Sequence, residues 1–505
     1  MVSKVKGYRN ESIRPVIGKS ILPFSPLPGK VFLDFGITLI YKLIMLDLYP
    51  VRFSHRLNAV RPGLPVRAFG SPDHHCVKGL RTGLKAELAD LNREGLLRKP
   101  KVISDIDGAR VKIDGKWLVS FCSNDYLGLA QHPALKKAMI DATRKFGAGA
   151  GSARLLSGTT ALHQELEQAI ARFKHADDAL LFTSGYAANL GVITTLIKKD
   201  DVVFCDELNH ASLVDAARLT KARLHIYRHC DMTHLESLLR SDAHERSAPY
   251  PKASGRNARS LSRQGRGSTP NALRFIITDA IFSMDGDAAP LKEMVRLARK
   301  YNVRTIVDEA HGTGVFGKTG RGWCEASGLE KKVDVVIGTA SKALGSLGGF
   351  VAGNQVLIDY IRNKSRPFIF TTALPAGSCA ATITALKVLY DKPTLRKKLW
   401  DNTDYIKERL KKMGFNLRNS FRSFGAHGHA IASSVSPIIP ILIGDTRKTV
   451  AISHALWTKG FYVPAIRPPT VPQGQSRLRL TITAMHTKEQ MDGLIRELRN
   501  HRLHR

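Results

Sequence analysis

The chain is short of acidic residues. It has 43 Asp and Glu against 77 Lys and Arg, which gives a formal net charge of +34 and a pI near 10.1. Such an excess favours an anionic partner, either a nucleic acid, a membrane surface or a negatively charged small molecule. Aromatic residues are also few, 7% of the chain, and the basic segments 1–60 and 240–274 lack the interleaved aromatic residues on which bases stack. A basic nucleic-acid-binding protein is therefore only an alternative, and we expect no nucleic-acid partner.

Cysteine is scarce as well. The six cysteines contain no C-x-x-C pair, which argues against a disulfide scaffold and favours a reducing compartment. At 43%, the hydrophobic content is ordinary for a soluble globular protein. The most apolar stretch, residues 31–50, is interrupted by Asp34, Lys42 and Asp47, so no uncharged run reaches the roughly 18 residues that a membrane-spanning helix needs.

Targeting signals are weak. The apolar stretch comes too late for a signal peptide and has no clear small-residue cleavage site, so we do not expect secretion. The basic, acid-poor start resembles a mitochondrial transit peptide in composition, although early prolines weaken an amphipathic helix there. The ending HRLHR is not a peroxisomal signal. We expect a cytoplasmic or organellar protein.

Composition shifts predict an α/β protein with four segments. We expect a short hairpin with Asp114 and Gly115 as its turn, and strands that alternate with helices to give a mostly parallel sheet. A Ser/Arg/Gly-rich insert with almost no apolar content should be a solvated loop. The predicted segments are a poorly ordered extension at 1–75, a helix and hairpin at 76–124, a large domain at 125–385 that carries the insert at 243–270, and an α+β domain at 386–505.

The most informative stretch is VVIGTASKALGSLGG at 335–349, which places Lys342 between an apolar strand and a glycine-rich turn. Ligands of α/β proteins bind at the carboxyl ends of the strands. A partly desolvated amine there loses proton affinity and can form a Schiff base with an aldehyde. A solvated surface lysine is the alternative interpretation.

A second strand end carries two further candidates. In VRTIVDEAHGTG (303–314) a β-branched run ends at Asp308, and His311 follows before glycines that let the backbone turn sharply. An aspartate there can keep a pyridine nitrogen protonated, which makes a pyridoxal ring an electron sink, and His311 can bond the phenolic oxygen of that ring. Helix capping by Asp308 and metal ligation by His311 are the alternatives, but no second metal-spaced His/Cys cluster accompanies them, so we expect no metal.

Two helix starts complete the set. In ALLFTSGYAANLGVITTLI (179–197) a strand, a Ser-Gly turn and a helix leave amides near Ser184, Gly185 and Tyr186 that could bind a phosphate. His210 stands just before a helix that begins around Ser212. Its ring could stack on an aromatic cofactor, although a capping or packing histidine is the more common case.

Together the motifs resemble the pyridoxal-phosphate-dependent α-oxoamine synthases. The resemblance implies an enzyme with the fold-type I transferase fold, in which a large domain with a mostly parallel seven-stranded sheet carries a smaller α+β C-terminal domain. It also implies a homodimer, a pyridoxal 5′-phosphate cofactor, and condensation of an amino acid with an acyl-CoA. The motifs are FCSNDYLGLAQHP (121–133), GAGAGSARLLSGTTALHQELE (147–167), LFTSGYAANLG (181–191), DELNHASL (206–213), IFSMDGDAAPL (281–291), IVDEAHGTGVFGKTGRG (306–322) and GTASKALG (338–345).

The resemblance also implies roles for individual residues. Lys342 corresponds to the Schiff-base lysine and general base, Asp308 to the partner of the pyridine nitrogen, and His311 to the partner of the phenolic oxygen. The other implied cofactor contacts are Gly185, Tyr186, His210, Ser283 and Thr339, with His210 stacked on the ring. The implied substrate contacts are Arg98, Thr470 and Arg479, with Arg479 on the substrate α-carboxylate, and Arg467 is a further candidate for a distal carboxylate.

The segment AIRPPTVPQGQSRLRLTITAMHT (465–487) resembles the family members that condense L-alanine with pimeloyl-CoA. Glycine C-acetyltransferase is the alternative within the family, and a non-catalytic partner subunit is an alternative of another class, against which Lys342 argues. Whether the acyl donor is a coenzyme A or a carrier-protein thioester stays open.

Overall fold

A computed structural model describes residues 75–247, 272–415 and 435–500 of the chain. The chain divides into two compact units, residues 1–77 and 78–505, and nearly all described residues belong to the second. The predicted extension at 1–75 and most of the predicted insert lie outside the described residues. Within the described part, no helix is both long and apolar enough to cross a membrane.

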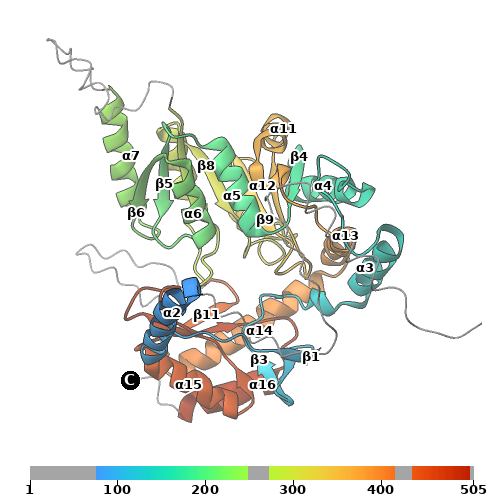
Figure 1. Ribbon diagram of the computed structural model, residues 1–505, viewed down its shortest axis with the longest axis vertical. Helices are drawn as coiled ribbons and strands as arrows, with labels where there is room; N and C mark the ends of the chain where they lie inside the picture. The colour runs from blue at the N-terminus through green and yellow to red at the C-terminus, as the bar shows by residue number, and fades with distance from the viewer. Residues whose placement is uncertain (1–74, 248–271, 416–434, 501–505) are drawn as a thin grey trace, which may run out of the picture. The chain divides into compact units, whose positions relative to one another are not determined.

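The main sheet has seven strands and is mostly parallel, as the sequence predicts. Only β10 runs antiparallel to its neighbours β4 and β9. Strand β5 is buried at every position, which explains its continuous apolar sequence. In sheet order the strands are β4 (Asp178–Phe182), β10 (Gly349–Gly353), β9 (Val335–Thr339), β8 (Arg304–Asp308), β7 (Arg274–Asp279), β5 (Val202–Asp206) and β6 (Arg223–Tyr227) (Figure 1).

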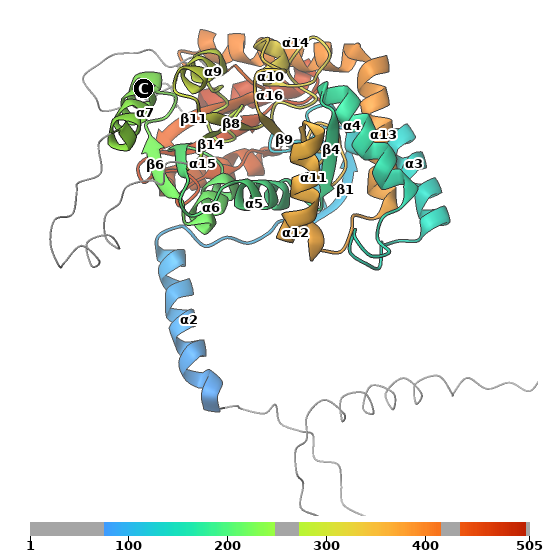
Figure 2. The ribbon, with the colours of Figure 1, turned by 90° about the horizontal axis from the view of Figure 1, so that it is seen from above.

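Helices cover both faces of this sheet. Figure 2 shows α5 and α6 on one side of the strands, with α9 and α10 on the other. Alternate strand residues pack into separate apolar clusters with the two helix layers, as the two-residue period of a strand requires. The first layer comprises α5 (Gly185–Leu196), α6 (Ala211–Thr220), α11 (Gln355–Lys364) and α12 (Arg366–Ile369), and the second comprises α7 (Met232–Ser247), α9 (Leu291–Lys300) and α10 (Trp323–Ala326).

A third group of helices packs beside β4 and β10. These are α3 (Pro133–Phe146), which follows the 3-10 turn η1 (Leu129–Gln131), α4 (Ala161–Lys174) and α13 (Ala376–Asp391). Helix α13 packs on α3 and α4 and runs across residue 385, where the sequence predicts the end of the large domain. A composition shift does not mark that boundary because the helix is apolar on both sides of it.

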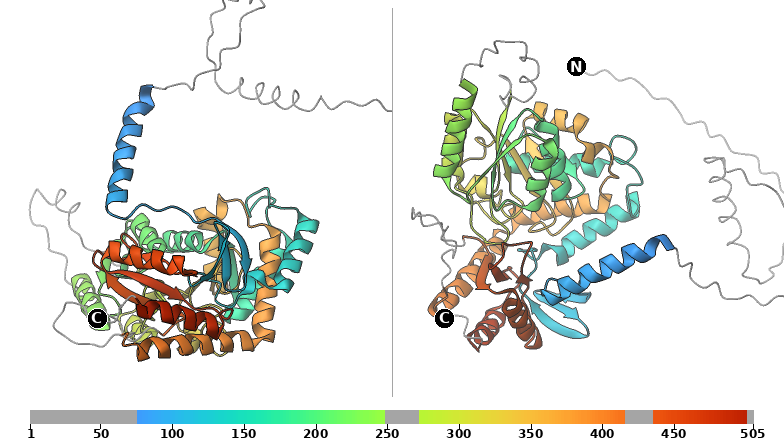
Figure 3. Two further views of the ribbon diagram at one scale, coloured as in Figure 1. Left: turned by 90° about the horizontal axis from the view of Figure 1, so that it is seen from below. Right: turned by 60° about the vertical axis from the view of Figure 1, so that its left-hand side comes forward.

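The C-terminal part is an α+β assembly, coloured orange to red in Figure 3. Its three-stranded antiparallel sheet has the order β11–β14–β13. The elements are α14 (Pro393–Lys412), β11 (Ile438–Gly444), α15 (Thr446–Thr458), β12 (Phe461–Tyr462), β13 (Ala465–Ile466), β14 (Ser476–Thr481) and α16 (Lys488–Asn500).

The N-terminal hairpin has the expected turn, but it belongs with this C-terminal part. Asp114 and Gly115 take φ values of 49° and 77°, the left-handed conformation of a two-residue hairpin turn. Strand β12 pairs with β3 in parallel and completes a four-stranded sheet. The segment begins with helix α2 (His75–Arg93), and its strands are β1 (Ile103–Asp107), β2 (Arg110–Ile113) and β3 (Lys116–Ser120).

The predicted solvated insert starts later than expected. Helix α7 extends to Ser247, and Glu245 within it forms an ion pair of 2.8 Å with Arg223. The first residues of the predicted loop 243–270 are therefore helical, because a partner on β6 holds them.

Candidate active site at the carboxyl edge of the sheet

Three neighbouring parallel strands end in aspartates. Strands β5, β7 and β8 end at Asp206, Asp279 and Asp308, and β9 ends at Thr339. The ladder pairs Asp279 directly with Asp308. Since the carboxyl ends of parallel strands meet at one edge, these side chains form a polar rim on an otherwise apolar sheet.

Lys342 lies three residues beyond the end of β9 and is partly buried. Among the described residues, no hydrogen bond or ion pair holds its amine. Burial lowers the pKa of Lys342, while Asp308 and Asp279 raise it and Arg479 lowers it further. The site therefore presents an amine with reduced proton affinity, which suits both attack on an aldehyde and proton abstraction.

Asp308 is only 4% exposed and accepts two hydrogen bonds, both from neutral donors. Asn189 Nδ2 donates to it at 2.7 Å, and the backbone N–H of Ala310 donates at 2.7 Å. No ion pair of the described residues includes Asp308. A buried carboxylate without a cation is costly, so this geometry is ready for a positively charged ligand atom.

His311 is buried and shares a hydrogen bond of 2.6 Å with the hydroxyl of Tyr126 through Nδ1. Burial lowers the pKa of His311 well below its usual value, and the positive charges of Lys342 and Arg479 lower it further. The ring is therefore neutral at physiological pH. A neutral ring with one nitrogen fixed by Tyr126 leaves Nε2 available to a ligand oxygen.

His210 is the N-cap of α6, and its ring is exposed. Its Nδ1 accepts from the backbone N–H of Ser212 at 3.3 Å, and its own backbone N–H donates to Asp279 at 2.6 Å. Although the residue as a whole is exposed, partial desolvation of the ring lowers the pKa of His210, Asp308 raises it and Lys342 lowers it. His210 caps α6, and this contact leaves a face of its ring uncovered. The expected stacking of that ring on a cofactor stays a prediction.

The start of α5 lies beside the end of β9. Ser184 caps the helix by accepting from the amide of Ala187 at 3.0 Å, so the amides of Gly185 and Tyr186 are among those that no helical carbonyl reaches. A Cβ on Gly185 would stand 3.5 Å from the Thr339 Cβ. The Tyr186 hydroxyl instead donates to Asp215 at 2.6 Å, which points its side chain elsewhere. Gly185 and Thr339 thus lie side by side at a helix N-terminus, the kind of position at which anions bind.

Arg479, on β14, is 5% exposed and donates only to neutral acceptors. Its Nε donates to the Ser283 carbonyl at 2.6 Å, Nη1 to the Thr481 hydroxyl at 2.8 Å, and Nη2 to the Asn124 amide oxygen at 3.2 Å. In the described ranges it has no carboxylate partner within ion-pair distance. Its charge is therefore available to a substrate carboxylate.

The remaining predicted residues gather at a second place. Arg98 Nη2 donates to the Pro468 carbonyl at 2.9 Å, and Arg467 Nη2 donates to the Leu97 carbonyl at 2.8 Å. Thr470 is exposed, and its amide donates to the Arg467 carbonyl at 3.1 Å. Burial lowers the pKa of Arg467, and so does the neighbouring charge of Arg98. The two guanidiniums therefore lie close enough for their charges to repel each other, and a bound anion would relieve that repulsion.

The arginine pair, Arg98 and Arg467, and the rim around Lys342 share no hydrogen bonds in the described part of the chain. No hydrogen bond of the described residues joins Thr470 to that rim either. Their joint participation in one site is therefore a proposal.

Three rim residues were not among the predicted ones: Tyr126, Asn189 and Asp279. Tyr126 and Asn189 lie inside the motifs at 121–133 and 181–191. Their hydrogen-bond partners, His311 and Asp308, are 185 and 119 positions away, so the sequence does not show these contacts. Asp279 ends its strand as Asp308 does, which is a signal that strand-end reasoning could have used. Burial raises the pKa of Asp279 well above its usual value, and the charge of Asp308 raises it further.

The comparisons with known proteins identify the class to which this fold and rim belong. Residues 116–498 match the family described as aminotransferase class I and II, and the chain belongs to that family. It is 41% identical to an 8-amino-7-oxononanoate synthase of Thermoanaerobacter pseudethanolicus over 82% of this chain and 95% of the relative. It is 42% identical to 8-amino-7-oxononanoate synthase 1 of Bacillus velezensis over 83% of this chain and 96% of the relative.

Solved structures agree in fold. A serine palmitoyltransferase of Sphingomonas wittichii superposes with a TM-score of 0.71 at 30% identity, covering 84% of this chain and 97% of that one. A structure described as SPT with PLP internal aldimine gives a TM-score of 0.72 at 32% identity over 84% and 97% of the two chains. An 8-amino-7-oxononanoate synthase of Francisella tularensis gives 0.60 at 25% identity over 76% and 97%. The expected fold-type I architecture is confirmed.

Proposed function

We propose that this protein is an acyltransferase that condenses L-alanine with a pimeloyl thioester, as pimeloyl-CoA or its carrier-protein equivalent, to give 8-amino-7-oxononanoate. The carbon–carbon bond forms between the alanine α-carbon and the thioester carbonyl, the thiol leaves, and the alanine carboxylate leaves as carbon dioxide. This is the reaction that precedes the later steps of biotin biosynthesis. The observation that carries the proposal is the identity of 41% and 42% to synthases of this name over almost their whole length.

The rim fits pyridoxal 5′-phosphate as the cofactor. Asp308 is a buried carboxylate that lacks a cation among the described residues, and a protonated pyridine nitrogen would supply one. The amides at the start of α5, with Thr339 beside Gly185, suit its phosphate, and the Ser283 segment is a further contact. When bound, the cofactor supplies an electron sink that stabilises negative charge on the α-carbon of an amino acid.

The protein's own groups divide the remaining work. Lys342 would hold the cofactor aldehyde through its amine, and the same amine, when free, would serve as the base for the proton on the α-carbon of alanine. In the tautomer in which Nδ1 of His311 accepts from the Tyr126 hydroxyl, Nε2 carries the proton and would donate it to the phenolic oxygen of the cofactor. His210 would stack on one face of the cofactor ring. Asp308 would lie next to the pyridine nitrogen, where a carboxylate would favour the protonated form of that nitrogen.

Arginines orient the two substrates. Arg479 binds the alanine carboxylate. Its present hydrogen-bond acceptors are all neutral, so its positive charge is not yet paired with a carboxylate. Arg98 and Arg467, with Thr470 beside them, bind the distal carboxylate of the pimeloyl chain. A pair of guanidiniums without a carboxylate partner in the described chain is suited to such a ligand.

A homodimer is part of the proposal. Leu155, Leu156 and Phe370 are 51%, 81% and 69% exposed, and they stand on two loops that an isolated bridge between Ala153 and Thr372 joins. Exposed large apolar side chains grouped in this way mark an interface. A second copy of the chain is the expected partner, and light scattering of the purified protein checks the mass. Cys122, Cys205, Cys230, Cys324 and Cys379 are free thiols, and a reducing compartment, cytoplasmic or organellar, is part of the proposal.

One assay tests the function. Purified protein loaded with pyridoxal phosphate should release coenzyme A from pimeloyl-CoA in the presence of L-alanine and form 8-amino-7-oxononanoate, detected by mass spectrometry. Glycine with acetyl-CoA is the comparison, because it is the substrate pair of glycine C-acetyltransferase. Faster turnover of glycine and acetyl-CoA would overturn the assignment while leaving the family and fold intact.

A further inference from the structure

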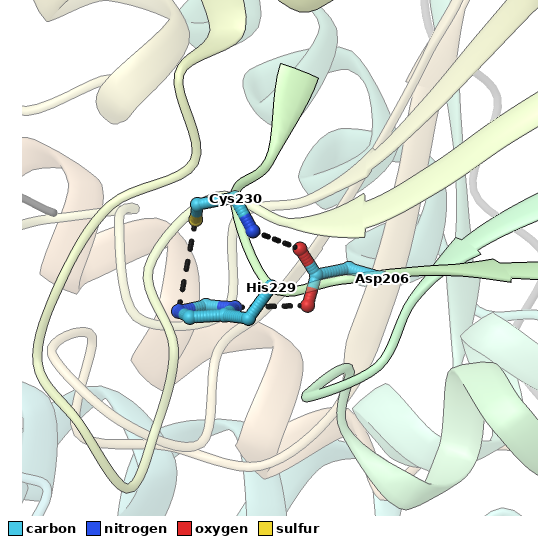
Figure 4. Close-up of side chains that lie close together, drawn as sticks. All are labelled: Asp206, His229 and Cys230. Atoms are coloured by element: carbon cyan, nitrogen blue, oxygen red, sulfur yellow. Dashed lines mark hydrogen bonds and ion pairs between the residues drawn. The ribbon is translucent and has the colours of Figure 1, made fainter. Parts of the chain in front are cut away.

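A second charged cluster lies at the same edge of the sheet. Asp206, at the end of β5, lies beside His229 and Cys230, and Figure 4 shows these three side chains around one point. His229 Nδ1 stands 2.9 Å from Asp206 Oδ1, and on the other side Nε2 stands 2.8 Å from Asp287 Oδ2. The imidazole is 5% exposed, and each carboxylate is 1% exposed.

The chemistry of the partners sets the charge of this histidine. Ionised carboxylates only accept hydrogen bonds, so a ring between Asp206 and Asp287 must donate from both nitrogens. Burial by itself would lower the pKa of His229, but the hydrogen bonds to Asp206 and Asp287 outweigh it and raise the pKa far above its usual value. His229 is therefore an imidazolium.

The same contacts argue against a metal ion in the cluster. Both nitrogens of His229 are already engaged, and Asp206 also accepts from the amides of Leu208 and Cys230, at 2.9 and 2.8 Å. Burial raises the pKa of the Cys230 thiol to about 12, so the thiolate that a metal needs is disfavoured.

Asp287 closes the turn that follows β7. Its carbonyl accepts from the amide of Phe282 at 3.0 Å, and Gly286 donates back to Phe282 at 2.9 Å. Gly286 has φ of 71°, and a Cβ there would come within 2.1 Å of the Ile438 carbonyl, so the turn is held tightly against β11. Ser283 lies in this turn.

The turn also carries the anchor of the proposed substrate arginine. Arg479 donates to the carbonyl of Ser283 at 2.6 Å, and two positions earlier on β14 Arg477 donates to Asp285 at 2.5 Å. Arg477 and Asp285 are buried, with side chains 1% and 6% exposed. Asp285 and Asp287 thus hold the turn from two sides, one through Arg477 and the other through His229.

We propose that His229 is a positioning residue for amino-acid recognition: it ties the end of β5 to the Phe282–Asp287 turn and so fixes the Ser283 carbonyl that orients Arg479. The inference rests on the proposed function for the part in which Arg479 binds the alanine carboxylate. Because a guanidinium fork grips a carboxylate only when both are aligned, a loosened turn weakens alanine binding before it affects the chemistry of the rim. Lys342 and Asp308 keep their places, since β8 and β9 carry them.

The test compares two variants with a matched control in the loaded enzyme. His229→Gln removes the charge and one of the two bridges, and Asp287→Asn keeps the size of the side chain and one acceptor oxygen. Lys174→Met removes a buried amine that donates to Thr313, outside the proposed site. For each protein the experiment measures kcat and KM for both substrates, and alanine affinity from the change in cofactor absorbance without acyl donor.

We expect His229→Gln to raise KM and the dissociation constant for L-alanine by about tenfold, the size typical of a lost supporting contact, with KM for pimeloyl-CoA unchanged within about twofold. Asp287→Asn should also raise KM and the dissociation constant for L-alanine, but by a smaller factor. Lys174→Met should lower the melting temperature and leave both KM values unchanged. If His229→Gln does not fold, Asp287→Asn decides the question alone.

Two results would overturn the inference. One is a His229→Gln or Asp287→Asn protein that loses thermal stability, as Lys174→Met does, but binds alanine normally. The other is one equivalent of zinc in the purified wild-type protein that is absent from His229→Gln, since the cluster would then be a metal site. A wild-type protein that ignores alanine refutes the proposed function instead, and the comparison is then run with the amino acid that it accepts.

Discussion

Asp206 and Asp308 end two parallel strands of one sheet, separated by β7 alone, yet the protein treats them differently. Both are almost fully buried, at 1% and 4% exposure. Asp206 is paired with the imidazolium of His229. Asp308 accepts only from the neutral donors Asn189 and Ala310. Asp206 has a cation in direct contact, whereas Asp308 has none within ion-pair distance among the described residues, and Lys342 acts on it only from farther away.

The difference in pairing indicates a structural role for Asp206 and a ligand-binding role for Asp308 at the same edge of the sheet. Burying a carboxylate next to a fixed cation leaves little for a ligand to gain, and such a pair holds loops together. A carboxylate buried against neutral donors lacks the compensation that a direct cation gives, so a cationic ligand has free energy to gain there. We therefore propose that the cofactor site is built around Asp308 and that Asp206 has a structural role.

The largest effect is expected at Lys342, beside the open carboxylate. Lys342→Ala should lower kcat by roughly four orders of magnitude or more, because one amine serves as both anchor and base. The visible absorbance of the lysine-bound cofactor should disappear, while circular dichroism and melting temperature stay near wild type. Lys174→Met, which also removes a buried amine, is the control and should keep its activity. Near-native turnover by Lys342→Ala would remove the basis of the assignment.

The two aspartates are compared directly by the same substitution. Asp308→Asn should lower kcat by about two to three orders of magnitude, comparable to removing one preorganised electrostatic contact, with little change in stability. Asp206→Asn should leave kcat near the wild-type value. It should destabilise the fold by on the order of 3 kcal/mol, since it breaks a buried ion pair. Urea unfolding and exchange of the alanine α-proton for deuterium measure the two effects. Equal losses of activity would erase the distinction.

The arginine pair should affect only one substrate. Arg98→Ala and Arg467→Ala are each expected to raise KM for pimeloyl-CoA by about tenfold, the cost of one charged hydrogen bond, with KM for L-alanine unchanged. Repeating the assay with the methyl ester of the distal carboxylate provides the control, because the variants should no longer differ from wild type. A rise in the alanine KM instead would assign the pair to the amino-acid side.

The smallest effect is expected away from the rim. Deleting residues 248–271 and joining the ends with a short glycine linker keeps α7 and its Arg223–Glu245 ion pair intact. Catalysis should change by less than about twofold, because this segment carries no rim residue and loop-closure entropy varies slowly with length. Steady-state kinetics decides, and a large rise in KM for the acyl thioester alone would show that the segment binds substrate.

The sequence predicts the rim well because its residues follow their strands directly. Asp308, Thr339 and Lys342 stand at or just after the ends of β8 and β9, where a local pattern of apolar residues and glycines marks the edge. Gly185 and His210 likewise stand at helix starts that local signals predict.

What the sequence does not show depends on contacts between distant segments. The pairing of Tyr126 with His311, of β12 with β3, and of His229 with Asp287 joins residues that no local pattern links. The charge of His229 follows from its two partners, so it could be assigned only once both were known. The same holds for Asp308, whose lack of a cation is a property of the packed structure.

The central claim is that Asp308 is kept open for a cationic ring nitrogen. Nitrogen NMR of the protein loaded with pyridoxal phosphate labelled at that ring nitrogen measures its protonation directly, in wild type, Asp308→Asn and Asp206→Asn. We expect the nitrogen to be protonated at neutral pH in wild type and in Asp206→Asn, and to lose its proton in Asp308→Asn. A nitrogen that stays protonated in Asp308→Asn, or is unprotonated in wild type, would contradict the account.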